Sequence, residues 1–331
     1  MKFVVKMEIA LLVIVILVAV GMILASEGVF DLFFEPVIAQ KAEMPIPEEA
    51  VTAPPQVTEP AEETPDQKAP VTWEITAKEY FVYDIRQEAY LRMQGDKDAR
   101  IYPASITKLL TCYTVLQHMA PDTQVTVGDA MDLVQLDSSV AGLEKGDVLT
   151  VEQLVEAMLM VSGNDAAQVA AVAAGRAIAE NSWLSCEDAV AVFAREMNRQ
   201  AEALGMENSH FVNPDGFHHP DHYTTMEDMV RLCKEVLTNQ TILKYAGLLG
   251  DAIELPDRTL ELRNTNVFLY QDLGFYMPNA IGLKTGYTEQ AGNCLVSAFF
   301  EKDTVWIIGV FGCAKGNENR YHDTLAIYNS L

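Results

Sequence analysis

The pattern of hydrophobic and polar positions divides the chain into three parts. Residues 9–25 form an unbroken apolar run, residues 35–70 are rich in Pro, Glu, Thr and Ala, and regular hydrophobic patterning begins near Trp73. Prolines recur through the second stretch and prevent regular structure, so it predicts an extended acidic tether. We therefore expect three parts: a signal anchor or signal peptide at 1–26, an extracytoplasmic linker at 27–72 and one globular domain at 73–331.

The apolar run near the N-terminus predicts targeting to a membrane. Lys2 and Lys6 precede it, and basic residues in this position keep the N-terminus in the cytoplasm. The run is at the short end of a membrane-spanning helix and slightly long for the core of a signal peptide, and no clean cleavage site follows it. We favour an uncleaved single-pass anchor in the cell membrane with an extracytoplasmic domain, whereas a cleaved segment would give a secreted protein.

Within the globular part, strand-like and helix-like periods can be told apart. Apolar and alternating runs predict two hairpins, 80–83 with 89–93 and 294–300 with 305–312, and the second hairpin is apolar enough for central strands. A helical period predicts helices at 102–116, 150–161, 166–179, 186–204, 226–237 and 320–328. Thr150 and Gln153 form a capping-box pattern, and Asp165 is placed to cap the next helix.

Composition narrows the possible partners. The chain has 331 residues, of which 50% are hydrophobic, so it can bury a large core. It carries 23 Lys and Arg against 47 Asp and Glu, and it has no basic run beyond Lys2 and Lys6, so we expect no nucleic-acid partner. The cysteines include no C-x-x-C pair, which argues against a zinc knuckle. They predict small buried thiols, at Cys112, Cys186, Cys233, Cys294 and Cys313.

Ser105 and Lys108 are the first candidates for chemistry. They stand three residues apart at the start of the predicted helix over 102–116, so the amine lies beside the hydroxyl. Burial lowers the pKa of a lysine, and a neutral amine held beside Ser105 can accept the hydroxyl proton. Ser-x-x-Lys also occurs by chance on solvated helix faces, so the catalytic interpretation needs support from the rest of the chain.

Two further motifs supply that support. Ser162-x-Asn164 stands in the turn between two predicted helices, and Lys284-Thr285-Gly286 stands on a predicted strand. Three motifs in this order and in these structural contexts are not explained by chance. The chain resembles the penicillin-binding serine enzymes, and within them the low-molecular-mass D-alanyl-D-alanine carboxypeptidases, over about residues 79–325. The segments that carry the resemblance are Tyr102-Pro103-Ala104-Ser105-Ile106-Thr107-Lys108-Leu109, Ser162-Gly163-Asn164-Asp165-Ala166-Ala167, Asn213-Pro214-Asp215-Gly216, His222-Tyr223-Thr224-Thr225 and Gly282-Leu283-Lys284-Thr285-Gly286-Tyr287-Thr288.

The resemblance implies a fold and a reaction. The implied fold is α/β (α+β), of the penicillin-recognising serine transferase or β-lactamase-like type, with an antiparallel sheet flanked by helices and a helical subdomain. The implied reaction removes the terminal D-Ala from peptidoglycan pentapeptide stems through an acyl-enzyme on Ser105. β-Lactam antibiotics would acylate the same serine, and no cofactor is implied.

The resemblance also assigns catalytic roles to residues at the centre of the site. Ser105 is the nucleophile, Lys108 its base, and Ser162 relays a proton to the leaving amine. Asn164 hydrogen-bonds the substrate amide and the Lys108 side chain. The backbone N–H groups of Ser105 and Tyr287 form the oxyanion hole.

The remaining assignments concern substrate binding. Lys284 and Thr285 bind the terminal carboxylate of the substrate, and Gly286 lets the acyl chain lie close to the strand backbone. Arg320 matches an arginine that relatives use for the free carboxylate, and a solvated arginine at a helix start is the alternative.

The histidines in the middle of the chain do not predict a metal site. The spacing of His218, His219 and His222 does not fit helical ligand pairs, and no catalytic carboxylate pattern accompanies them. We expect a structural or orienting role for His222. Asp215 departs from the histidine common at that place in relatives, and Tyr287 replaces a residue that varies.

Two rival functions remain open. A β-lactamase needs a carboxylate that activates the deacylating water, and two Glu-x-x-x-Asn pairs, Glu235 with Asn239 and Glu289 with Asn293, have a suitable spacing. The first pair is typical of a solvated pair at a helix end, and the second follows Lys284. The other rival is a penicillin-sensing or wall-binding module that is acylated without turnover. The deacylation base, endopeptidase or transpeptidase side activity and the oligomeric state are not determined by the sequence.

Overall fold

The computed structural model describes residues 73–331. The predicted targeting segment at 1–26 and linker at 27–72 lie outside these residues. Within the described part, no helix combines the length and hydrophobicity needed to cross a membrane.

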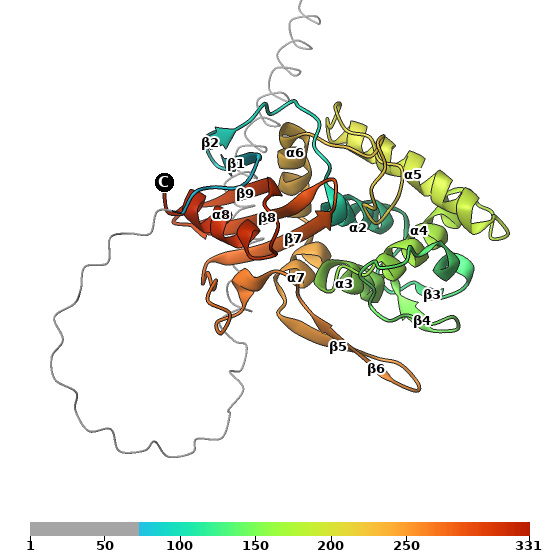
Figure 1. Cartoon of the computed structure of the whole chain (residues 1–331). Coiled ribbons are helices and arrows are strands. Elements are labelled where there is room, and N and C mark those ends of the chain that lie inside the picture. Colours follow the sequence, from blue (N-terminus) through green and yellow to red (C-terminus); the bar gives the residue numbers. More distant parts are fainter. Residues whose placement is uncertain (1–72) are drawn as a thin grey trace, which may run out of the picture. The chain divides into compact units, whose positions relative to one another are not determined.

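A five-stranded antiparallel sheet joins the two ends of the described chain (Figure 1). Its strand order is β2-β1-β9-β8-β7, so β9 and β8 are interior strands, as the sequence predicts. Both predicted hairpins are confirmed, and β1 pairs with β9. The five-stranded sheet is therefore complete only when the first hairpin pairs with the last one. The strands are β1 (Glu79–Asp84), β2 (Ala89–Gln94), β7 (Ala280–Thr288), β8 (Gly292–Glu301) and β9 (Thr304–Cys313).

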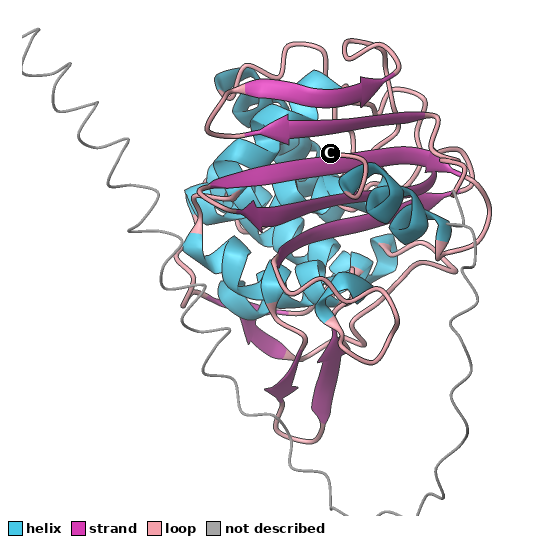
Figure 2. Ribbon diagram, turned by 90° about the vertical axis from the view of Figure 1, so that its left-hand side faces the viewer, coloured by secondary structure: helices cyan, strands magenta, loops and turns pink. Residues whose placement is uncertain are grey.

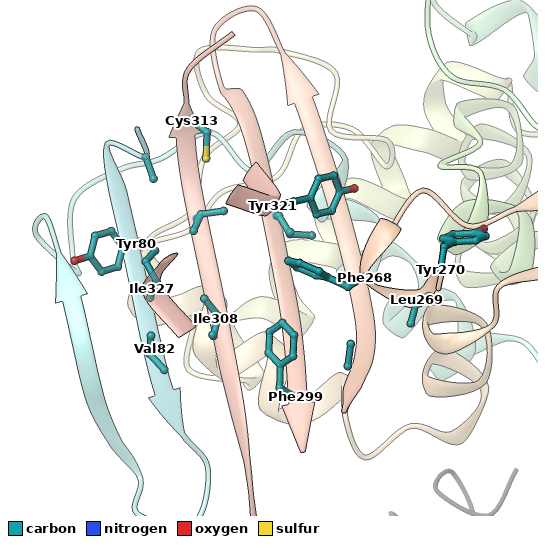
Figure 3. Close-up of a cluster of buried hydrophobic side chains, with 14 residues drawn as sticks. Tyr80, Val82, Phe268, Leu269, Tyr270, Phe299, Ile308, Cys313, Tyr321 and Ile327 are labelled. Atoms are coloured by element: carbon teal, nitrogen blue, oxygen red, sulfur yellow. The ribbon is translucent and has the colours of Figure 1, made fainter. Parts of the chain in front are cut away.

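One face of the sheet packs against the C-terminal helix α8 (Asn319–Tyr328). Phe299 and Ile308 project from the sheet towards Tyr321 and Ile327 of α8, and Phe268 of the short 3₁₀ helix η3 (Val267–Leu269) completes the cluster (Figure 3). These side chains are buried, so apolar contact contributes to fixing α8 on the sheet.

The helices cover the other face of the sheet, and all of them come from the segment between β2 and β7 (Figure 2). Helix α2 lies at their centre, and its Leu109, Leu110 and Val115 are fully buried. A helix that is apolar on most of its circumference is expected at such a position. The helices are α2 (Lys108–His118), α3 (Val151–Met160), α4 (Asn164–Ile178), α5 (Cys186–Ala203), α6 (Met226–Val236) and α7 (Gln240–Gly247).

Two details differ from the sequence prediction. The helix predicted over 102–116 begins as a separate 3₁₀ turn, η1 (Ala104–Thr107), and becomes α-helical only at Lys108. The predicted cap at Asp165 is wrong, because α4 begins at Asn164. The Asp165 carboxylate instead accepts hydrogen bonds from backbone N–H groups in a neighbouring loop, those of Ala141, Gly142 and Leu143. By contrast, the capping box between Thr150 and Gln153 is confirmed.

The sequence did not predict two small two-stranded antiparallel sheets, β3 (Gln124–Thr126) with β4 (Val148–Thr150) and β5 (Gly250–Glu254) with β6 (Thr259–Arg263), nor helix α7. The β5–β6 hairpin projects from the body of the domain (Figure 2). Arg258 near its tip forms an ion pair with Asp147. Arg263, Asn264 and Thr265, at the end of this hairpin and just after it, line the candidate site.

Candidate active site

Ser105 and Lys108 meet because of the 3₁₀ turn. In a 3₁₀ helix, side chains three residues apart eclipse one another, and Ser105 in η1 therefore lies directly beside Lys108 at the start of α2. The Lys108 Nζ atom is 2.9 Å from Ser105 Oγ. Ala104 has a φ of 50°, a left-handed conformation that is strained for a residue with a side chain. The backbone just before the nucleophile is thus held in an unusual shape by its surroundings.

Two glycines from different segments, Gly286 and Gly216, pack against this turn. A Cβ atom on Gly286 of β7 would lie 2.9 Å from the Pro103 carbonyl oxygen and 3.2 Å from the Ser105 backbone nitrogen. A Cβ atom on Gly216 would lie 1.9 Å from the Ala104 carbonyl oxygen. The sequence assigned Gly286 to close approach of an acyl chain. In the structure, the side of Gly286 that lacks a side chain faces the nucleophile turn of the protein itself.

The partners of Lys108 fix the direction of its amine. Besides Ser105, Lys108 Nζ contacts Asn164 Oδ1 at 2.7 Å and the Asp215 carbonyl oxygen at 2.8 Å. Both of these oxygens can only accept hydrogen bonds. A neutral amine has two N–H groups and one lone pair, so when both N–H groups are donated to Asn164 and Asp215, the lone pair points at Ser105 Oγ. This arrangement suits a base that takes the serine proton.

The electrostatic surroundings of Lys108 favour a neutral amine near neutral pH. Burial lowers the pKa of Lys108 to about 8, and the negative charge of Asp215 opposes this effect. Cys112 and Asp165 act in the same direction as Asp215. A pKa near 8 leaves a working fraction of neutral amine at pH 7 to 8 and also a base strong enough to accept a proton.

Asp215 and Gln168 form a buried polar pair behind Lys108. The Asp215 carboxylate accepts hydrogen bonds from Gln168 Nε2 and from the Phe217 backbone N–H, both at 2.9 Å. Gln168 lies one helical turn after Asn164, so a single face of α4 positions both the Lys108 acceptor and the Asp215 carboxylate. Gln168 belongs to none of the sequence motifs. Its spacing of four from Asn164 was the only available signal.

His222 supports the nucleophile turn through a second hydrogen-bond chain. Its Nδ1 atom accepts a hydrogen bond from the Val212 N–H, and its Nε2 atom lies 2.8 Å from Thr107 Oγ1. The proton of a neutral ring therefore sits on Nε2 and is donated to Thr107. Burial lowers the pKa of His222 to about 3, so the ring stays neutral. Within residues 73–331, no group of three or more metal-binding side chains comes together.

Ser162 and Asn164 form the opposite wall, at the turn between α3 and α4. Ser162 has a φ of 62° and lines the cleft, and its hydroxyl makes no hydrogen bond to any described residue. The Asn164 N–H donates to the Ser139 carbonyl oxygen at 2.8 Å, which ties this turn to the loop over 136–139. The structure brings both side chains to the same cleft as Ser105.

The third wall is β7. Lys284 is fully buried, and its amine donates to the Thr285 carbonyl oxygen at 3.1 Å. The Thr285 hydroxyl lies 2.8 Å from that of Thr265, a residue outside the sequence motifs. Burial lowers the pKa of Lys284 well below its usual value, and the positive charges of Lys108 and Arg320 lower it further. No carboxylate of residues 73–331 forms an ion pair with Lys284, so this wall suits an incoming anion.

Arg320 is not the solvated arginine that the sequence left as an alternative. Its side chain is only 6% exposed. Its guanidinium donates to backbone and side-chain oxygens of four residues, Gly286, Cys294, Asn293 and Asn317. These bonds engage Nε and both terminal nitrogens. Arg263, at the end of β6, is by contrast an exposed arginine of the cleft, and its guanidinium lies 4.7 Å from the centre of the Tyr270 ring.

The three walls enclose a cleft of about 910 Å³, large enough for a short peptide. Tyr287, 55% exposed, stands at its mouth. Glu289 of the rival β-lactamase interpretation also lines the cleft but is exposed. The other pair is not part of the cleft lining, and Asn239 caps α7. No buried carboxylate therefore comes from either rival pair.

Fold and cleft together define the class of the protein, the penicillin-recognising serine enzymes. The model of the D-alanyl-D-alanine carboxypeptidase family matches residues 62–315. The chain belongs to this family.

Individual relatives agree with this assignment. The chain is 31% identical to D-alanyl-D-alanine carboxypeptidase DacF of Bacillus subtilis over 67% of its own length and 54% of that protein. It is 30% identical to D-alanyl-D-alanine carboxypeptidase DacC of Escherichia coli over 70% of its own length and 55% of that protein. The crystal structure of the DD-transpeptidase of Streptomyces K15 superposes with a TM-score of 0.69 at 27% identity, covering 78% of this chain and 98% of that one. The chain thus spans about half the length of the first curated relatives that it matches.

Proposed function

We propose that the protein is a serine-type D-alanyl-D-alanine carboxypeptidase that removes the terminal D-Ala from peptidoglycan pentapeptide stems. The observation that carries this proposal is the amine of Lys108, whose two fixed acceptors direct its lone pair at Ser105. Family membership supports the same reaction.

In the proposed reaction, Ser105 Oγ attacks the carbonyl carbon of the penultimate D-Ala while its proton passes to Lys108 Nζ. The new Oγ–C bond forms, the peptide C–N bond breaks, and the proton returns through Ser162 to the leaving amine of the terminal D-Ala. A water molecule then attacks the ester, gives a proton to Lys108, and restores the Ser105 hydroxyl. β-Lactams would acylate Ser105 by the same attack.

The β7 wall would recognise the free carboxylate that distinguishes this substrate. Lys284 and Thr285 offer a charge and a hydroxyl, and the ligand carboxylate would supply the counter-charge that no described residue gives to Lys284. Carboxylate binding should therefore raise the pKa of Lys284 and be accompanied by proton uptake.

A direct test measures two products. The protein is incubated with a diacylated Lys-D-Ala-D-Ala peptide, and released D-Ala is quantified; in parallel, penicillin hydrolysis is followed. Release of D-Ala with slow release of bound penicillin supports the carboxypeptidase. Fast penicillin hydrolysis would instead identify a β-lactamase, and labelling without peptide turnover would identify a penicillin sensor.

We also propose that the apolar run at 9–25 anchors the protein in the cell membrane and that the acidic tether holds the catalytic domain outside the cytoplasm. The full-length protein should sediment with membranes and require detergent for extraction, while a chain starting at residue 71 should not. Detergent-free solubility of the uncleaved full-length protein would contradict the anchor.

A further inference from the structure

We propose that Arg320 is a positioning residue for the oxyanion hole and that it acts by fixing the peptide group between Gly286 and Tyr287. This inference rests on the proposed acyl-transfer function. It assigns to Arg320 a role different from the carboxylate recognition that the sequence suggested.

The hydrogen bonds of Arg320 argue against direct carboxylate binding. One terminal nitrogen donates to the Gly286 carbonyl oxygen at 3.1 Å and to the Cys294 carbonyl oxygen at 3.2 Å. The other donates to the side-chain oxygens of Asn293 and Asn317, and Nε donates to the Asn317 carbonyl oxygen. These bonds use all five donors of a guanidinium. A substrate carboxylate could recruit Arg320 only by leaving buried oxygens unsatisfied, which is costly.

The bond to Gly286 sets the direction of the next N–H. The Gly286 carbonyl and the Tyr287 N–H belong to one trans peptide group, and they point in opposite directions. Strand β7 is at the edge of the sheet, with β8 on one side only. Arg320 holds the Gly286 carbonyl together with that of Cys294, a residue of β8. The Tyr287 N–H is therefore turned away from β8, towards the open edge of β7.

The nucleophile turn packs directly against β7 at this peptide. A Cβ atom added to Gly286 would lie only 3.2 Å from the Ser105 backbone nitrogen, so the two segments are in contact. Ser105 and Tyr287 also line the same cleft. With the peptide held in this orientation, the N–H groups of Ser105 and Tyr287 can face one oxyanion between them.

Arg320 is suited to this task by its shape and its charge. Its planar guanidinium bonds β7, β8 and the loop before α8 at once, so the three segments are held in a fixed arrangement. A buried positive charge behind the oxyanion peptide also favours the negative charge that develops on the carbonyl oxygen during attack.

The experiment compares two ligands that differ only in a carboxylate. Acylation rate constants at saturation, and the concentrations that give half-saturation, are measured for a penicillin and for its methyl ester. Wild type, Arg320→Met and Lys284→Met are compared. Arg320→Met should slow acylation roughly 10- to 100-fold with both ligands, because oxyanion stabilisation is lost from the transition state. Lys284→Met should weaken binding of the acid and leave the ester largely unchanged.

The opposite pattern would overturn the proposal. If Arg320→Met affects only the acid, and mainly through half-saturation, then Arg320 binds the carboxylate after all. If wild type is not acylated by either ligand, the proposed function fails rather than this inference. Single-turnover rate constants do not depend on the fraction of folded protein, so a partly unfolded variant does not imitate the expected result.

A milder variant keeps the proposal testable if Arg320→Met does not fold. Asn317 is exposed, and Asn317→Ala removes one acceptor of the guanidinium while leaving Arg320 in place. We expect a fall of a few-fold in the acylation rate constant with both ligands, since the arginine is less firmly held. An effect restricted to the acid would again contradict the proposal.

Discussion

Lys108 and Lys284 are both fully buried in the same site, yet their surroundings differ. Lys108 has three oxygen partners from three separate segments, and a nearby carboxylate at Asp215 partly offsets the effect of burial. Lys284 donates only to the neighbouring Thr285 and is close to two further cations. The first lysine is arranged to exchange a proton, whereas the second is arranged to meet an anion.

This difference shows that burial alone does not define a catalytic lysine. Burial lowers the pKa of both amines. What separates them is whether the protein supplies the acceptors that direct the lone pair and the charge that restores basicity. Substitutions of these lysines and of their neighbours should therefore have different effects on acylation.

Lys108→Met should have the largest effect. The variant loses the base, so the acylation rate constant should fall by roughly 10²- to 10⁴-fold, the usual range for a general base. The buried site accepts an apolar side chain of similar length, so thermal unfolding should show a folded protein. Stopped-flow labelling with a fluorescent penicillin measures the rate, and a rate within a few-fold of wild type would show that another group is the base.

Lys284→Met should have an intermediate effect that depends on the ligand. Loss of a charge-assisted hydrogen bond should weaken binding of a D-Ala-D-Ala peptide by roughly 10- to 100-fold, with a smaller change in the turnover rate. Steady-state D-Ala release separates KM from kcat. A peptide amide, which lacks the carboxylate, serves as the matched control, and an equal loss with the amide would rule out carboxylate recognition by Lys284.

Asp215→Asn should shift the pH profile of acylation. The base works only when neutral, so the rate rises with pH through the pKa of Lys108, near 8. Removing the Asp215 charge should lower that pKa, and the rise should move to lower pH by roughly one unit. Asp215→Glu keeps the charge and should retain the wild-type midpoint. Equal midpoints for Asp215→Asn and wild type would exclude an electrostatic role of Asp215.

His222→Gln should change the pH dependence of stability rather than the midpoint of the pH profile of acylation. The pKa of His222 in the folded state, about 3, lies below that of an unfolded histidine. Between these values the unfolded chain binds the extra proton, so acidification below about pH 6.5 should destabilise the wild type by up to roughly 1.4 kcal/mol per pH unit. Urea unfolding at several pH values should show a shallower dependence in the variant, and an identical dependence would refute the buried neutral ring.

Local patterns predicted much of the fold. The helices α3, α5, α6 and α8 and both hairpins of the main sheet follow from periodicity and capping, signals that lie within short windows of sequence. The β5–β6 hairpin was missed because its strands are short and mostly exposed, and α7 was missed because a helix of eight residues gives only a short periodic signal.

The site residues that belong to a sequence motif could be predicted. Residues of all three motifs line one cleft, because two of the motifs stand at the starts of helical segments and the third lies in the edge strand β7. The partners of Arg320 and the Gln168–Asp215 pair were not predictable, since each joins segments far apart in the chain. The contact of Gly286 with the nucleophile turn is of the same kind: a glycine in a strand signals close approach but does not say to what.

The central claim is that Ser105 is the acyl acceptor of this cleft. Intact-protein mass spectrometry after exposure to penicillin, followed by peptide mapping, tests it most directly in wild type and Ser105→Ala. We predict one penicillin adduct per wild-type chain, on the peptide that contains Ser105, and none on the folded variant. An adduct on another residue, or equal labelling of Ser105→Ala, would contradict the account.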